Sequence, residues 1–167
     1  ELRPPETFEE YNRIASFFTR RLNPSSPVNF GSTLTLGNTG VAATEFLARY
    51  FSLTDHLFDP EDNILLTSEE AVRALELLVA VRQYAPPTYC NWWRDTSRLF
   101  AQGDVAMTVL FSNYASEMLD RDSKVHTRIG YAMVPGRNPL LGGGSIGVCK
   151  YSHHKQEALN FIRWFCS

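Results

Sequence analysis

The alternation of helical and extended patterns along the chain is the feature that most restricts its fold. Apolar residues recur at helical spacing in several segments, as in the run of Phe8, Tyr11, Ile14, Ala15 and Phe18. Short β-branched or apolar runs separate these segments, and no internal repeat is visible. Helices that interleave with short strands predict an α/β fold or a helix-rich α+β fold.

Capping residues and helix breakers give approximate bounds to these elements. We expect helices at residues 8–22, 41–51, 69–84, 112–119 and 154–165, and a short helix that Asp95 or Thr96 caps and that ends at Gln102. We expect strands at residues 28–36, 105–110, 128–134 and 146–149, and a brief extended run at 64–66. Gly103 stands where a left-handed residue commonly ends a helix.

Length, composition and charge exclude several classes of protein. The 167 residues suit one domain or one lobe of a larger protein, and 44% of them are hydrophobic, which is enough for a core. With 16 basic and 18 acidic side chains, the chain shows no electrostatic footprint for nucleic acid. No apolar run approaches the roughly 20 residues that cross a bilayer.

The two ends and the cysteines bear on the origin of the chain. Residues 1–5 read like a linker, and the last residues, 164–167, lie inside an apolar segment. We therefore expect this sequence to be part of a longer chain.

Cys90, Cys149 and Cys166 have no regular spacing, which predicts reduced and mostly buried thiols. One disulfide and one free thiol remain an alternative.

The residues that most often carry catalysis or bind metals are not grouped here. His153 and His154 are adjacent, so their side chains point apart, and His56 and His126 are isolated. Cys90 has no neighbouring base that would activate it. A glycosidase is disfavoured because no carboxylate pair is recognisable. The chain is therefore predicted to be no enzyme and to hold neither metal nor cofactor.

Several segments, in order, resemble one known family. Glu6–Tyr11 is similar to its entry helix, and Phe100–Met107 to its helix-to-strand signature Phe-x-x-Gly-Lys-x-Ala-Met. Ile129–Gly136, then Gly143–Ser145, then Glu157–Ile162 are similar to its closing strand, glycine loop and helix. Together they resemble the family 1 extracellular solute-binding proteins, which serve sugar transporters.

The resemblance implies a two-lobed clamshell of the periplasmic-binding-protein type II class, whose lobes close on a ligand. Each lobe would be a helix-rich α/β unit, with a small mixed sheet flanked by helices. Residues 1–141 would belong to the C-terminal lobe, and residues 142–167 would be a crossover strand and helix of the other lobe. The implied function is non-catalytic binding of a mono- or oligosaccharide for an ABC importer, with its permease subunits as partners. The implied location is extracellular or periplasmic, as a lipoprotein with a membrane anchor. The family's Gly-x-Trp after Ala106-Met107 is absent here, which leaves the sugar undetermined.

A second function stays open. The chain could be a ligand-sensing module fused to a cytosolic transcription regulator, which three unpaired cysteines and the absence of an export signal favour. A homodimer of the chain is also expected, because a cut lobe exposes apolar surface.

Sugars present flat apolar faces and a ring of hydroxyls, so their sites pair aromatic rings with a few fixed polar groups. The candidate ligand-binding residues follow this rule and the resemblance: Asn38, Thr39, Asn91, Trp92, Trp93, Phe111, Asn113, Tyr114, Gly143, Gly144 and Ser145. The first two lie in a turn, the tryptophans in a loop before a helix, and the next three at a helix start where backbone N–H groups are free. Each group has a structural alternative. Residues 38 and 39 could serve only the turn, and the tryptophans could pack one in the core and one on the surface. Residues 111–114 could serve core packing and helix capping, and the glycine loop could be a flexible crossover.

Overall fold

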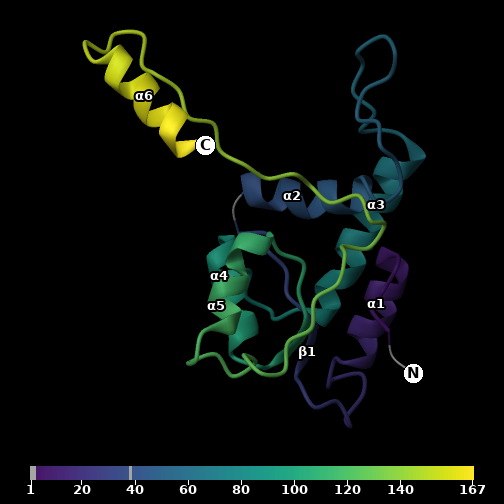
Figure 1. Ribbon diagram of the computed structural model, residues 1–167. Coiled ribbons are helices and arrows are strands. Elements are labelled where there is room, and N and C mark those ends of the chain that lie inside the picture. The colour runs from purple at the N-terminus through teal and green to yellow at the C-terminus, as the bar shows by residue number, and fades with distance from the viewer. Residues whose placement is uncertain (1–2, 38) are drawn as a thin grey trace.

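A computed structural model describes residues 3–37 and 39–167 of the protein (Figure 1). The α-helices of this part are α1 (Phe8–Phe17), α2 (Thr39–Tyr50), α3 (Glu69–Val81), α4 (Trp93–Ala101), α5 (Ala115–Leu119) and α6 (Lys155–Phe165). Short 3₁₀ turns, η1 (Arg82–Tyr84) and η2 (Ser112–Tyr114), extend α3 and precede α5. The strands are β1 (Phe30–Ser32) and β2 (Val105–Met107).

The sheet is small and parallel. β1 pairs with β2 so that Phe30 lies opposite Val105 and Ser32 opposite Met107. The connection between them carries α2, α3 and α4, as a parallel pair requires. The predicted α/β class is confirmed, although the sheet of the described residues is parallel rather than mixed.

The predicted strands are longer or more numerous than the observed ones. Residues 28–36 and 105–110 each contribute only three residues to the sheet. Residues 128–134 and 146–149 form no strand, and the run at 64–66 is reduced to one isolated antiparallel bridge between Phe58 and Ile64. A strand exists only where a neighbour pairs with its backbone, and within the described residues 128–134 and 146–149 have no strand beside them.

The helix predictions fail mainly at their ends. The helix expected at 8–22 ends at Phe17, because the chain turns where the Thr19 hydroxyl donates to the Ala15 carbonyl over 2.7 Å. The next residues form tight turns, such as the 2.8 Å bond from the Leu22 N–H to the Thr19 carbonyl. Helix α4 begins at Trp93, earlier than expected. Gly103 does adopt the expected left-handed conformation, with φ of 78°.

The core lies where α1 and α3 pack together next to the sheet. Phe8 and Tyr11 of α1 are buried against Leu77 and Val81 of α3. Helix α1 also approaches β1 so closely that a Cβ added at Gly31 would overlap the backbone of Ala15. This contact fixes the end of β1, from which the chain runs on toward α2.

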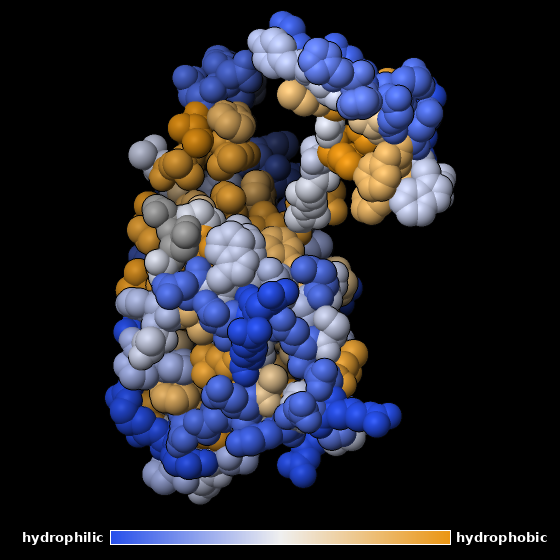
Figure 2. Space-filling model, turned by 90° about the vertical axis from the view of Figure 1, so that its left-hand side faces the viewer, coloured by the Kyte–Doolittle hydropathy of each residue, from blue (hydrophilic) through white to orange (hydrophobic). Residues whose placement is uncertain are grey.

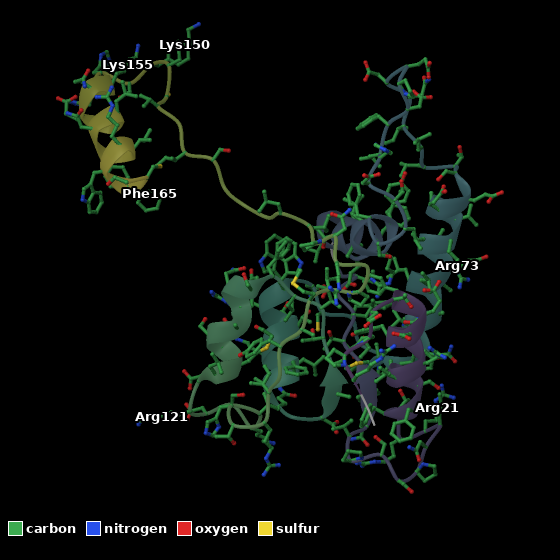
Figure 3. The ribbon with its side chains drawn as sticks, turned by 45° about the vertical axis from the view of Figure 1, so that its right-hand side comes forward. Arg21, Arg73, Arg121, Lys150, Lys155 and Phe165 are labelled. Atoms are coloured by element: carbon green, nitrogen blue, oxygen red, sulfur yellow. The ribbon has the colours of Figure 1, made fainter. Side chains whose placement is uncertain are left out.

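Residues 142–167, here called the C-terminal arm, differ from the rest of the molecule. An extended segment leaves the body and ends in α6, which stands apart from the other helices (Figure 1), and no residue of the arm is buried. Figure 2 shows the arm as a protruding part with hydrophobic side chains on it, and Figure 3 shows Lys150, Lys155 and Phe165 far from Arg21 and Arg73.

The cysteines follow this division. All three thiols are free, as predicted, but only Cys90 is buried, while Cys149 and Cys166 are exposed on the arm. The prediction of mostly buried thiols is therefore wrong, because the arm has no surface to pack against.

Among the described residues no helix combines the length and apolar character that a membrane span needs.

Candidate functional site

Residues 33–37, which follow β1, hold two helices in place. The Thr35 N–H donates to Oε1 of Glu45 in α2 over 3.0 Å, and the Thr35 and Thr96 hydroxyls are 2.7 Å apart, which ties the segment to α4. The Gly37 N–H donates to the Cys90 carbonyl over 3.0 Å. These buried bonds place α2 next to the start of α4.

The start of α4 sets the direction of two tryptophans. Trp92 is the N-cap residue in extended conformation, and its N–H donates to Oδ2 of Asp95 over 3.0 Å. This bond satisfies a backbone donor at the helix start. Trp93 therefore lies in the first turn of α4, not in the loop before it as predicted. Trp92 remains 46% exposed, while Trp93 is half-buried.

Four aromatic rings from the start of α4 and from the η2 turn meet here and form what we call the aromatic cluster: Trp92, Trp93, Phe111 and Tyr114. The centroid of the Trp93 ring is 4.7 Å from that of Trp92, 5.2 Å from Phe111 and 6.5 Å from Tyr114. The Phe111 ring stands edge-on to Trp93 at 85°, a preferred geometry for aromatic pairs.

A second contact keeps the cluster together from the side of α5. Glu117 accepts a short hydrogen bond from the buried Ser97 hydroxyl, and its Oε1 lies 2.9 Å from Nε of Arg94. Both partners belong to α4, so α5, and with it the adjoining Tyr114, is fixed relative to Trp93.

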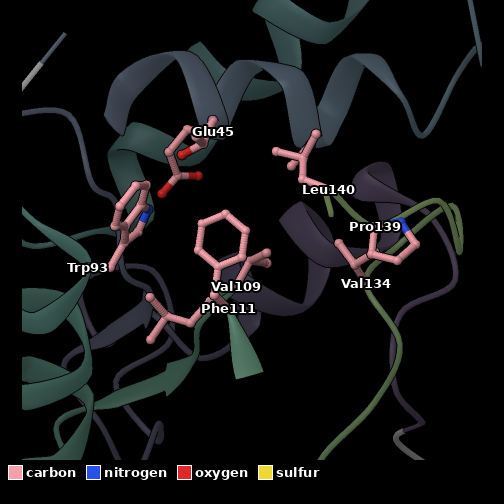
Figure 4. A pocket seen from close by; sticks show the side chains of 10 residues that line it. Glu45, Trp93, Val109, Phe111, Val134, Pro139 and Leu140 are labelled. Atoms are coloured by element: carbon pink, nitrogen blue, oxygen red, sulfur yellow. The ribbon is translucent and has the colours of Figure 1, made fainter. Parts of the chain in front are cut away.

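A cavity of about 80 Å³ opens beside the cluster (Figure 4). Its lining residues are Thr44, Glu45, Ala48, Trp93, Val109, Leu110, Phe111, Val134, Pro139 and Leu140. They come from α2, from the start of α4, from the segment after β2 and from the crossover to the arm. Figure 4 shows Glu45 and Trp93 on one side of the cavity and Val134, Pro139 and Leu140 on the other. We call this cavity the aromatic pocket.

Glu45 is the charged side chain of this lining, and it is held firmly. Its side chain is 10% exposed, and Oε2 lies 2.9 Å from an Nη atom of Arg49, which is itself 2% exposed. The Arg49 guanidinium in turn lies 4.8 Å from the centroid of the Phe8 ring. A buried carboxylate needs such partners, because the loss of hydration is otherwise not offset.

A second, larger cavity of about 510 Å³ lies between α1, the β2 segment and residues 129–135. Its lining is mostly apolar, and Arg3 is the one charged residue among the described residues that line it. Of the aromatic cluster it includes only Phe111. Trp93 and Glu45, which line the aromatic pocket, are not among its lining residues.

The comparison with protein families agrees with this architecture. Residues 3–167 match the family model described as bacterial extracellular solute-binding protein. The chain belongs to the bacterial extracellular solute-binding proteins. The resemblance found in the sequence motifs is thereby confirmed.

Two relatives show how much of such a protein the chain represents. A probable amino-acid ABC transporter periplasmic-binding protein, y4oP of Sinorhizobium fredii, is 25% identical over 143 residues, which are 83% of this chain and 32% of that protein. The crystal structure of an ABC transporter solute-binding protein from Agrobacterium radiobacter K84, in complex with ribitol, aligns over 99% of this chain and 43% of that one. Its TM-score is 0.77 at 22% identity, which shows a common fold. The chain thus spans about a third to two fifths of the length of these solute-binding proteins.

Not all of the predicted ligand residues come together. Trp92, Trp93, Phe111 and Tyr114 do, and Gly142 joins them, since a Cβ added there would come within 2.8 Å of the Phe111 ring. Asn91 lies against Gly37 and is exposed, as is Asn113.

The glycine loop lies apart from the aromatic cluster. A Cβ added at Gly143 or Gly144 would meet no heavy atom within 4 Å, and Ser145 is exposed, so the loop beyond Gly142 leaves the cluster. Asn38 and the side chain of Thr39 lie outside the described residues.

Sequence reasoning missed Glu45, the charged group of the pocket. A signal was present, because Glu45 and Arg49 are the two charged residues of α2 and stand four positions apart on one face. An ion pair in an otherwise apolar helix indicates a buried pair. The apolar wall formed by Val134, Pro139 and Leu140 had no such signal, since it depends on where the crossover runs.

Cys90 lies near the pocket, and its environment fits a structural thiol. Burial raises the pKa of the Cys90 thiol, and a hydrogen bond with Thr96 opposes this only in part. Since the thiolate is the nucleophile, burial lowers its reactivity. Among the described residues no three His, Cys, Asp or Glu side chains are grouped as a metal site would need.

Proposed function

We propose that the chain forms one wall of the ligand site of a solute-binding component of an ABC importer, and that the solute is a mono- or oligosaccharide or a sugar alcohol. The observation that carries the proposal is the aromatic pocket itself. Trp93 and Phe111 offer ring faces, Glu45 offers a fixed acceptor, and Val109 and Leu140 complete an apolar wall. This is the combination that the apolar faces and hydroxyls of a sugar require.

The two relatives favour different ligands, which sets the alternatives. The name of the Sinorhizobium protein points to amino acids, whereas the Agrobacterium structure holds ribitol. In the pocket of this chain, Glu45 is the one charged residue among the ten described lining residues, so the carboxylate of an amino acid would find no cation there. We therefore favour a neutral, hydroxyl-rich solute and a binding role without catalysis.

The lobe assignment is part of the proposal. Residues 1–141 would form part of the C-terminal lobe, and residues 142–167 would cross to the other lobe, where α6 would pack. The exposed aromatic face of α6 supports this, since Phe161, Trp164 and Phe165 are 51%, 71% and 65% exposed here. Exposed apolar patches of this kind mark surfaces that another surface covers.

The setting of the full-length protein follows from the same role. It would work outside the cytoplasmic membrane, held there by an anchor, and deliver its solute to the permease subunits of the importer. The 167-residue chain alone would bind ligand weakly and would associate into dimers through its exposed apolar faces.

A thermal-shift panel of sugars, sugar alcohols and amino acids on the full-length protein tests the ligand class. A ligand that binds the native state raises the melting temperature, because binding adds RT ln(1 + [L]/Kd) to the free energy of unfolding. We expect a neutral polyol or sugar to do so. Stabilisation by amino acids alone would replace sugar with amino acid in the proposal.

Paired variants locate the site. Trp93→Ala should lower the affinity for the stabilising ligand at least about tenfold, since a stacked aromatic ring contributes most of its contact area. Phe17→Ala, which removes an exposed aromatic ring from the end of α1, is the matched control and should leave affinity unchanged. Equal effects of the two would refute the placement of the site.

A further inference from the structure

We infer that the polar groups of the aromatic pocket select between ligands of the same shape but different charge. This inference rests on the proposed function and deepens it. The relevant groups are the Glu45 carboxylate and the indole N–H of Trp93, which lie on the same side of the pocket in Figure 4.

The Glu45 carboxylate retains unused acceptor capacity. A carboxylate has about four lone-pair positions. The Thr35 N–H takes one position on Oε1 at 3.0 Å, and Arg49 takes one on Oε2 at 2.9 Å. Both of these partners lie outside the pocket lining, so the remaining positions are available to a donor in the pocket.

The Trp93 indole N–H is the complementary group. It is a donor only. The structure gives it no hydrogen-bond partner within residues 3–37 and 39–167, and its ring lines the same cavity as Glu45. A hydroxyl placed between the two groups would donate to Glu45 and accept from Trp93. An ammonium group has no lone pair for Trp93, and a carboxylate has no proton for Glu45.

The charge of the pocket acts in the same direction. Arg49 already compensates Glu45, so a neutral ligand adds no charge to the buried pair. An anionic ligand would bring a second negative charge beside Glu45, in surroundings where charges are poorly screened and none of the ten described lining residues is a cation.

Glu45 and Trp93 together thus determine specificity at this site: they bind a hydroxyl of a neutral polyol or sugar and reject the corresponding sugar acid. Ribitol and ribonate are the probes, because they share the carbon skeleton and differ at one end, where an alcohol is replaced by a carboxylate.

Isothermal titration of the full-length protein with both compounds provides the first test. Ribitol should bind at least about tenfold more tightly than ribonate. Ribonate binding as tightly as ribitol would overturn the inference while leaving the proposed function standing. If neither these compounds nor any neutral sugar binds, the proposed function fails, and this inference fails with it.

Two variants test the individual groups. Glu45→Gln should lower the affinity for ribitol about tenfold or more, because the charged acceptor is lost. It should also reduce the ratio of the ribitol affinity to the ribonate affinity. Glu76→Gln, at an exposed glutamate of α3, is the matched control and should change neither value. An unchanged preference in Glu45→Gln would refute the role of the carboxylate.

Since Glu45 also holds Arg49 and Thr35, Glu45→Gln could unfold the chain. Trp93→Phe then decides, because it keeps an aromatic face and removes only the N–H donor. It should weaken ribitol binding several-fold with the melting temperature of the free protein nearly unchanged. Full ribitol affinity in Trp93→Phe would overturn the inference.

Discussion

Helices α1 and α6 are both amphipathic and similar in length, but α1 packs in the core whereas α6 is exposed. They span 10 and 11 residues, and both carry aromatic residues on one amphipathic face. In α1 that face is buried: Phe8 is 1% exposed and Tyr11 is 3% exposed. In α6 the face is open, with Phe161 51% exposed and its ring 5.9 Å from that of Phe165.

The difference teaches that an amphipathic pattern specifies a helix and the face it offers, but not the partner that covers it. Helix α1 has α3 and β1 beside it, whereas α6 stands on an extended segment away from the body. Burial of apolar surface stabilises at about 25 cal/mol per Å², so the same pattern contributes greatly in α1 and little in α6. The following substitutions in the 167-residue chain test this contrast.

Alanine in place of the matched phenylalanines should show the largest contrast. Phe8→Ala removes a buried ring that also faces Arg49, and should lower the free energy of unfolding by about 3–5 kcal/mol. Phe161→Ala should change it by no more than about 0.5 kcal/mol, as at other exposed positions. Urea denaturation followed by circular dichroism measures both values. Equal losses would show that α6 is packed in solution.

The same pair carries the lobe assignment further. In the full-length protein, Phe161→Ala should become costly, because α6 would then pack on the other lobe. A cost that stays near zero there would contradict the proposed crossover of residues 142–167.

Alkaline pH should destabilise the body through a buried phenol of α1. Burial raises the pKa of Tyr11 to about 12, and a hydrogen bond with Ser32 opposes this only in part. Between pH 10, near the ordinary pKa of tyrosine, and pH 12, the folded state holds a proton that the unfolded state has lost. The stabilisation is therefore complete below pH 10 and falls by roughly 2–3 kcal/mol as the pH rises to 12.

Denaturation at stepped pH values measures this loss. Tyr11→Phe should flatten the decline, since it removes the titrating group and retains the ring. Tyr151→Phe, at an exposed position of the arm, should preserve the decline. A decline that persists in full in Tyr11→Phe would assign it to another group.

Helix caps should show the smallest contrast. The Thr7 hydroxyl accepts a hydrogen bond from the Glu10 N–H over 3.2 Å at the start of α1, whereas His154, the N-cap of α6, makes no side-chain capping bond. Thr7→Ala should cost about 1 kcal/mol. His154→Ala should cost close to nothing, and a comparable loss at both positions, measured by thermal melting, would contradict the observed capping.

The candidate site could be predicted from the sequence only in part. The tryptophan pair and the aromatic residues after β2 were identifiable, because aromatic side chains beside helix starts are typical of sugar sites. The distance of 5.2 Å between the Trp93 and Phe111 rings could not be predicted, since the packing of α4 on β2, η2 and α5 brings these two rings together. Glu45 was overlooked because a charged residue in a helix is usually solvated.

By itself, the sequence determined the order and type of the helices, the left-handed residue at Gly103 and membership of the solute-binding family. These depend on local spacing, caps and motifs, which neighbours along the chain supply. Only the tertiary structure decided which expected strands pair, which of two similar helices is buried, and that Glu45 and Trp93 share a cavity. Such features require surfaces distant in sequence to meet. A periodic pattern gives a helix an apolar face, but it does not specify which distant surface will cover that face.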